Sequence, residues 1–165
     1  MLKYGQGVTY TQGLNGKKFR EIAPESVKDI IKNYYEVHIS TITQKITQSE
    51  NPIIIDCHSF SDEAYECSPF TYHELPDVCI GYNRGDCKSE RLALFLADYW
   101  QGLGFSASIN APYAGAYQIG SNPAVMIEIN KRIYLYNDFL TKKSDFYKIK
   151  SLTKGAITQV EKFIF

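Results

Sequence analysis

The chain has 165 residues, 44% of them hydrophobic, which is enough for one sizeable core, and we expect a single domain over residues 1–165. Lysine plus arginine and aspartate plus glutamate both number 18, so the formal net charge is zero. This balance implies no general attraction to polyanions, and we expect no nucleic-acid partner.

The N-terminal stretch has no apolar segment of the signal-peptide type, and no later run approaches the ~20 apolar residues of a membrane span. We therefore expect a cytoplasmic protein without membrane association. The four cysteines show no C-x-x-C spacing, which argues against a zinc ribbon and a thioredoxin-type motif. Cys57 and Cys79 lie in apolar, strand-like runs, where we expect buried free thiols.

The first expected helix covers residues 24–47 and begins with Pro24, a residue favoured in the first turn. Its apolar side chains recur at steps of three and four residues and form one stripe: Val27, Ile31, Tyr34, Tyr35, His38, Ile42 and Ile46. His38 is either a structural histidine of this packing face or a group at the end of the stripe that touches a polar site. Both interpretations stay open.

A run of isoleucines at 53–55 shows no alternation with polar residues, which predicts a central strand near 53–57 with helices on both of its faces. Asp56 and His58 come at its carboxyl end, where open α/β sheets bind ligands. His58 either takes part in chemistry or caps the strand by bonding to a backbone carbonyl. The pattern does not decide between these two roles.

The remaining elements follow a long polar loop over residues 60–76. We expect strands near 78–82, 105–110 and 124–130, and helices at 88–103 and 150–163, the first of which stops at Gly104. Strand 78–82 ends next to Arg84, again at a carboxyl edge. The fold class is therefore α/β: three layers, with a mixed, mostly parallel sheet and helices on both faces.

Glu128 lies in the middle of the otherwise apolar run at 125–135. A buried carboxylate needs a partner or a proton, and burial raises its pKa toward the value that suits a general base at neutral pH. The alternative is an edge strand whose Glu128 points to solvent. Both remain open from this stretch alone.

Five segments in order resemble the N-formylglutamate amidohydrolase family, relatives of the zinc carboxypeptidases. They are Y-Y-E-V-H at 34–38, I-I-D-C-H-S-F at 54–60, D-V-C-I-G at 77–81, N-A-P-Y-A-G at 110–115 and M-I-E-I-N-K-R-I-Y-L at 126–135. The resemblance runs from about Tyr4 to Leu135 and covers the C-terminal two thirds of the family's pattern. It implies a zinc carboxypeptidase-like fold, shortened at its N-terminus.

The resemblance also implies a site. His58 corresponds to a zinc ligand of the family, and Glu128 corresponds to the general base that takes the proton of a metal-activated water. Asp56 would orient the His58 ring through its second nitrogen, and His38 would approach the floor of the same crevice. Substrate contacts would fall on three further residues: Arg84, Asn110 and Tyr113.

The chain departs from the family in its upstream part. The early histidine, the acidic residue and the arginine-bearing motif that family members carry there have no counterpart, and the loop at 115–123 lacks an arginine found in many relatives. Two hypotheses follow: a zinc-dependent amidohydrolase for a small N-acyl amino acid such as N-formylglutamate, or a non-catalytic remnant of the fold that binds a ligand or partner. A missing first strand would expose a sheet edge, which we expect self-association to cover, making a homo-oligomer.

Overall fold

The computed structural model describes residues 11, 17–18, 20–21, 24–62, 74–138 and 140–163. By its internal contacts the chain divides into two compact units. The helical unit comprises Met1–Pro52 with Cys67–Pro69, and the sheet unit comprises Ile53–Glu66 with Phe70–Phe165. The expected single domain stays a prediction.

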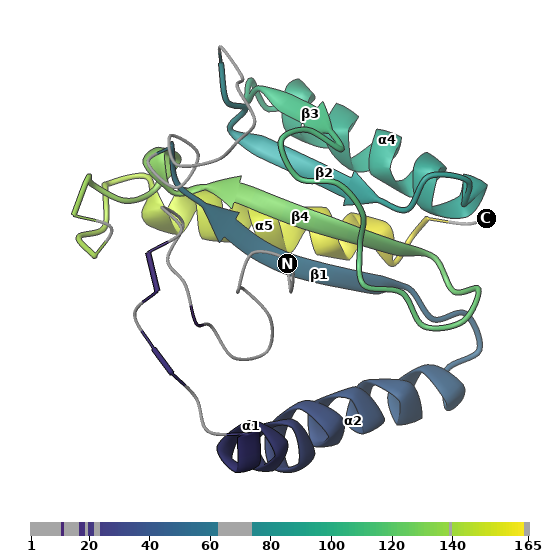
Figure 1. Cartoon of the computed structure of the whole chain (residues 1–165). Coiled ribbons are helices and arrows are strands. Elements are labelled where there is room, and N and C mark those ends of the chain that lie inside the picture. The colour runs from purple at the N-terminus through teal and green to yellow at the C-terminus, as the bar shows by residue number, and fades with distance from the viewer. Residues whose placement is uncertain are drawn as a thin grey trace. The chain divides into compact units, whose positions relative to one another are not determined.

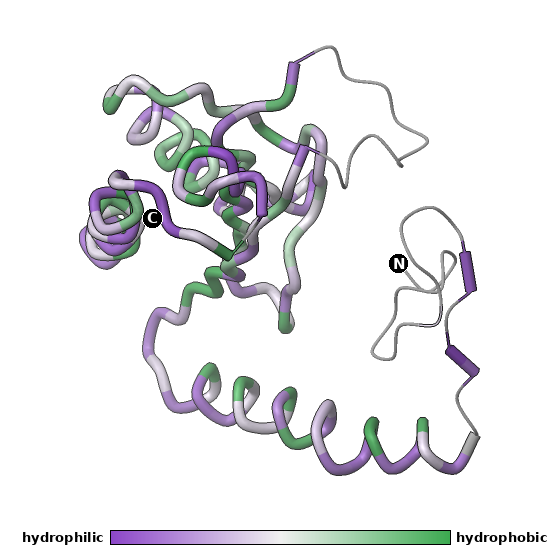
Figure 2. Tube along the Cα trace, turned by 90° about the vertical axis from the view of Figure 1, so that its left-hand side faces the viewer, coloured by the Kyte–Doolittle hydropathy of each residue, from purple (hydrophilic) through white to green (hydrophobic). Residues whose placement is uncertain are grey.

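In the helical unit a helix runs without a break over residues 24–47, the range that its apolar period predicted. It consists of α1 (Pro24–Ile30), one π-helical turn, η2 (Ile31–Tyr35), and α2 (Glu36–Thr47). Hydrophobic and hydrophilic residues alternate along it (Figure 2). None of the residues of η2 and α2 is buried, however, and Tyr34 is 72% exposed. The helix was predicted correctly, but its apolar stripe is not a buried face.

The sheet has four strands: β1 (Ile54–Phe60), β2 (Val78–Tyr82), β3 (Ala107–Ile109) and β4 (Ala124–Asn130). Their order is β1-β4-β2-β3, as Figure 1 shows. β1 runs parallel to β4 and β2 runs parallel to β3, whereas β2 and β4 are antiparallel. The prediction of a mixed, mostly parallel sheet is confirmed.

β1 is not the central strand that its isoleucine run predicted. In the described part of the sheet it pairs with β4 alone and forms one end of the strand order. Ile54, Ile55 and Asp56 are partly covered and Phe60 is buried, but the side chains between them, Cys57, His58 and Ser59, are exposed. The expectation of a buried Cys57 thiol is therefore wrong, because no described strand pairs with the outer side of β1. Cys79, on the inner strand β2, is fully buried as expected.

The apolar core lies on one face of the sheet. Alternation along the strands directs Val78, Ile80, Val125, Ile127 and Ile129 to the same side, where they join the core cluster. Two helices cover this face, α4 (Cys87–Gly102) and α5 (Phe146–Val160), and supply the rest of the cluster: Leu92, Ala93, Leu96, Ala97, Trp100, Ile149, Ala156 and Val160. Figure 1 shows α5 behind the sheet. A helix layer on the opposite face stays a prediction.

The ends of α4 follow from local chemistry. Asp86 is its N-cap, and Oδ1 accepts hydrogen bonds from the backbone N–H groups of Lys88 (3.1 Å) and Ser89 (3.2 Å). Past its C-terminus, Gly104 adopts a φ of 87°, a left-handed conformation that glycine takes without strain. No helix within the described ranges is long and apolar enough to cross a bilayer.

Candidate functional site

A row of polar side chains crosses the face of the sheet that lies away from the core. His58 of β1 is opposite Glu128 of β4, Glu128 is opposite Cys79 of β2, and Cys79 is opposite Ser108 of β3. Residues directly opposite each other on neighbouring strands share a face, so these side chains are lateral neighbours. The row brings together the two residues that the sequence singled out for chemistry, His58 and Glu128.

Glu128 is buried, with 8% of its surface exposed, because β4 has a strand on each side. Its Oε2 atom has no hydrogen-bond partner among the described residues. Burial raises the pKa of this carboxyl to about 7; the charge of Asp56 adds to the effect, whereas His58 and Lys131 oppose it. The buried interpretation of Glu128 is therefore the correct one. A carboxyl with this pKa can both accept and return a proton near neutral pH.

Asp56 and His58 stand two residues apart on β1 and therefore share a face. His58 Nε2 lies 2.8 Å from Asp56 Oδ1, and the two side chains are 43% and 36% exposed. The expected contact between these residues is present, although its role at a metal stays a prediction. Because Asp56 occupies Nε2, a further partner of the ring would use Nδ1.

The loop at 111–123 crosses the polar face in front of the sheet (Figure 1). Cys79 Sγ donates a hydrogen bond to the Tyr113 carbonyl (3.3 Å), and the Tyr113 ring packs edge-on to Phe60 with ring centres 5.5 Å apart. The loop also passes directly over Gly81, where an added Cβ would lie 2.4 Å from the Gly115 oxygen. Tyr113 is thus held over the strands that carry the row.

Side-chain amides anchor this loop at Gly115 and Ala116. Asn110, at a φ of 54°, accepts hydrogen bonds through Oδ1 from the N–H groups of Tyr82 (2.9 Å) and Gly115 (3.2 Å). Asn83 bonds to both backbone groups of Ala116, and its Nδ2 also donates to Gln118. The amide oxygen of Asn110 therefore helps to build the loop. Its expected contact with substrate stays a prediction.

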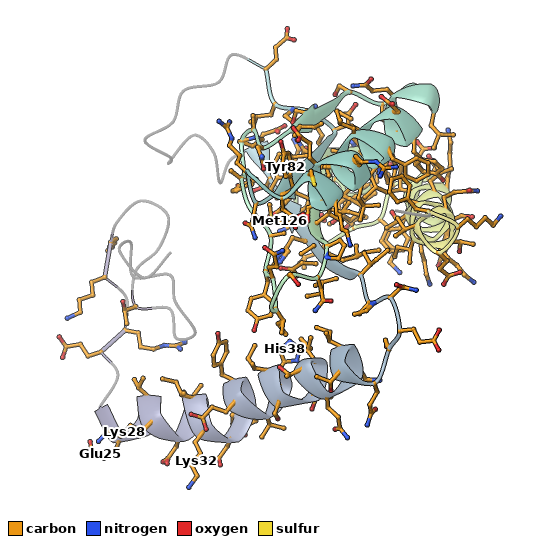
Figure 3. All side chains as sticks on the ribbon, turned by 90° about the vertical axis from the view of Figure 1, so that its right-hand side faces the viewer. Glu25, Lys28, Lys32, His38, Tyr82 and Met126 are labelled. Atoms are coloured by element: carbon orange, nitrogen blue, oxygen red, sulfur yellow. The ribbon has the colours of Figure 1, made fainter. Side chains whose placement is uncertain are left out.

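Within the sheet unit, the structure does not bring Arg84 next to His58. β2 is antiparallel to β4. The carboxyl end of β2 therefore lies at the opposite end of the strands from the carboxyl ends of β1 and β4. The exposed Arg84 follows β2 and so lies at that other end. His38 belongs to the helical unit and is exposed. Figure 3 shows His38 and Lys32 on opposite faces of their helix. The roles assigned to Arg84 and His38 stay predictions.

A polar cluster that was not predicted from the sequence lies at the carboxyl ends of β1 and β4. Arg132 donates to Asp62 Oδ1 (3.2 Å), Asp77 Oδ1 (3.0 Å) and the Leu75 carbonyl (2.6 Å), and Asn130 Nδ2 donates to Asp62 (2.7 Å). The cluster ties three segments of the sheet unit together at this edge. Asn130 shares a strand face with Glu128, but Arg132 follows β4 in the 3-10 turn η3 (Lys131–Ile133), so the spacing E-x-N-x-R at 128–132 alone did not predict the cluster.

The donor set was tested against the zinc ion that the family resemblance implies. A catalytic zinc takes three protein ligands and keeps one open position. No group of three His, Cys, Asp or Glu side chains within residues 24–62, 74–138 and 140–163 is arranged to hold a metal ion. The described residues therefore do not form a complete zinc site, although His58 and its carboxylate neighbours are suitable as part of one.

These features define an α/β protein with a buried acid and a histidine paired across parallel strands. The family model described as N-formylglutamate amidohydrolase matches residues 1–135. The chain therefore belongs to the N-formylglutamate amidohydrolase family.

Among solved structures, the chain is similar to the crystal structure of N-formylglutamate amidohydrolase from Ralstonia eutropha JMP134, with a TM-score of 0.74 and 19% sequence identity. The match covers 87% of this chain and 58% of that one, so the chain spans less than two thirds of the length of that relative. No curated protein matches the sequence. At this level of identity the structural match establishes the fold alone.

Proposed function

We propose that the chain carries the proton-transfer part of a hydrolase that cleaves the amide bond of a small N-acyl amino acid, of which N-formylglutamate is the expected example. The observation that supports this most is the buried Glu128 carboxyl, which has a pKa of about 7 and lies opposite His58 in the sheet. Family membership supplies the reaction class.

Glu128 is the base in this proposal. It takes a proton from the attacking water while the water oxygen bonds to the acyl carbon, and it returns that proton to the amine as the carbon–nitrogen bond breaks. A pKa near the working pH suits a group that must do both. Tyr113, held over the row by Cys79, is better placed to contact the substrate than Arg84, which lies at the other end of the strands.

Zinc remains part of the proposal. When bound, it would polarise the scissile carbonyl and acidify a water molecule. His58 would contribute one ligand through Nδ1, with Asp56 orienting the ring at Nε2 and His38 as a further supporting residue. The other ligands would have to come from outside the described residues, in keeping with the incomplete donor set. We also propose a zinc carboxypeptidase-like arrangement for the whole fold, because the family resemblance implies it.

The test is release of formate from N-formyl-L-glutamate, with and without added zinc, by the wild type and by Glu128→Gln. General acid–base catalysis contributes about 10²- to 10⁴-fold, so the variant should lose at least about a hundredfold in rate. Its fold should be retained, because the amide resembles the protonated acid. Glu50→Gln, at an exposed glutamate, is the matched control and should keep the wild-type rate. Hydrolysis that survives in Glu128→Gln would refute the assignment.

A second candidate is a non-catalytic domain that keeps the fold to bind a ligand or partner. The incomplete set of metal donors favours it. Metal analysis after gentle dialysis separates the two functions. One zinc per chain that is lost in His58→Ala supports the hydrolase, whereas a metal-free, folded and inactive chain supports the binding domain.

A further inference from the structure

The outer edge of β1 has a row of unpaired backbone groups. Ile54 N–H donates to the Pro123 carbonyl (2.9 Å), so the backbone groups of Ile54 and of alternate residues after it face β4. Ile55, Cys57 and Ser59 therefore direct their N–H and C=O groups outward. No hydrogen bond reaches these groups from the part of the chain that the structure describes. An open edge of this kind is a template for another strand.

A cavity of about 490 Å³ lies between this edge and α5. His58 and Ser59 line it from β1, and Ile149, Thr153 and Ile157 line it from α5. The free edge thus borders a groove whose apolar lining is interrupted by Lys150, Lys154 and Glu161. A surface that combines unpaired strand groups with a partly apolar groove is suited to a partner that covers both.

We propose that β1 pairs antiparallel with β1 of a second copy of this chain, about a two-fold axis at Cys57. In this register Ile54 is opposite Phe60, Ile55 opposite Ser59, Asp56 opposite His58, and Cys57 opposite itself. All seven residues of the strand are paired, and every outward-facing residue meets an outward-facing residue, as an antiparallel ladder requires. The two sheets join into one of eight strands, with the two β1 strands at its centre.

Charge complementarity selects a second copy in this register. Asp56 and His58 lie on the polar face, and the two-fold axis sets the acid of each chain opposite the histidine of the other. A shift by two residues in either direction would instead set Asp56 opposite Asp56, or His58 opposite His58. Two aspartates directly opposite each other destabilise a strand pair, and the register centred on Cys57 is the one of these three that sets each Asp56 opposite a histidine, so it is favoured.

The pairing has a consequence for the candidate site. Each His58 would lie between Asp56 of its own chain and Asp56 of the second copy, on the face that also carries Glu128. The assembled site would therefore contain one more carboxylate than a single chain supplies. The proposal does not rest on the proposed hydrolysis, because its readouts are molecular mass and cross-linking.

Sedimentation of Cys57→Lys tests the pairing. Cys57 is exposed, so a lysine is tolerated in the separate chain, but at the two-fold axis it sets two ammonium groups opposite each other. We expect the wild type to sediment as a dimer over a concentration series and Cys57→Lys to sediment as a monomer with an unchanged circular dichroism spectrum. Cys57→Ser, which adds no charge, and Leu94→Lys, at a side chain of α4 that is 50% exposed, should stay dimeric.

Disulfide cross-linking gives a second measurement that needs no variant. Directly opposed residues in a hydrogen-bonded antiparallel pair have Cα atoms about 5.5 Å apart, within the range that a disulfide spans. Diamide, which takes two electrons and two protons from the two thiols, should link Cys57 to Cys57 of the second copy, as read by peptide mass mapping. A monomeric wild type, a dimer that survives Cys57→Lys, or a cross-link through Cys87 instead would each overturn the proposal.

Discussion

Glu128 and Asp77 show how hydrogen-bond partners decide the charge of an acid within the sheet unit. Burial works against ionisation of Asp77, but hydrogen bonds from Ser106 and Arg132 outweigh burial and hold the pKa of Asp77 below its ordinary value. Glu128 has no such donor on Oε2, so burial prevails and its pKa rises to about 7. The first acid is a structural anion, whereas the second is free to exchange a proton.

The raised pKa of Glu128 predicts that stability falls as pH increases. The native state holds this proton more tightly than the unfolded chain, so the contribution is fully present below about pH 4.5 and is lost as pH rises through about 7. A rise from 4.5 to about 7 corresponds to about 3 kcal/mol at most. Glu128→Gln should lack this dependence. Urea unfolding at pH 5 and pH 8 measures the free energy of unfolding of the wild type and of Glu128→Gln, with Glu50→Gln as control. If the wild type and Glu128→Gln differ in this free energy by the same amount at both pH values, the prediction is contradicted.

At the scale of the elements, Gly81 allows the loop at 111–123 to lie against the sheet. In Gly81→Ala the new Cβ would meet the Gly115 oxygen at 2.4 Å and Met126 Cε at 2.7 Å, so the loop must move away. We expect a loss of roughly 1–3 kcal/mol in the free energy of unfolding, measured by urea denaturation. Gly102→Ala is the matched control, because its Cβ would meet nothing within 4 Å, and it should be neutral or stabilising. A Gly81→Ala protein as stable as Gly102→Ala would show that the loop is not packed as described.

The helices could be predicted because each has a 3.6-residue apolar period, and the strands because each is a short apolar run between polar stretches. Helix 24–47 matches its observed bounds, and helix 88–103 is displaced by a single residue at each end. The order of the strands in the sheet has no comparable signal in the sequence. The apolar run at 53–55 is typical of a central strand, yet β1 is at the edge, because half-covered isoleucines have the same pattern as fully covered ones.

The candidate site could be predicted only where a single residue stands out from its own stretch of sequence. Glu128 was visible because a carboxylate interrupts an apolar run, and His58 because it ends one. The antiparallel direction of β2, which sets Arg84 at the other end of the strands from the carboxyl ends of β1 and β4, has no signal in the sequence. The lateral position of Cys79 beside Glu128 depends on the register between distant strands, which no local pattern encodes.

At the scale of the whole molecule, burial is uneven between the units. No described residue of η2 or α2 is buried, whereas α4 has six buried side chains. Local stability follows such burial, so amides of α4 should exchange with deuterium about a hundredfold more slowly than those of α2. Hydrogen exchange with peptide-level mass spectrometry measures both in one sample. Equal protection of the two helices would contradict the prediction.

The same unevenness has a spectroscopic consequence. The chain contains one tryptophan, Trp100, which is fully buried in the core of the sheet unit and packs edge-on to Tyr99 and Phe105 at ring-centre distances of 5.8 and 5.5 Å. Its fluorescence is therefore a local signal from that core, whereas far-ultraviolet ellipticity sums the helices of both units. Melting curves recorded with these two probes describe different parts of the chain, and any interval between their midpoints measures how independently the helical unit unfolds.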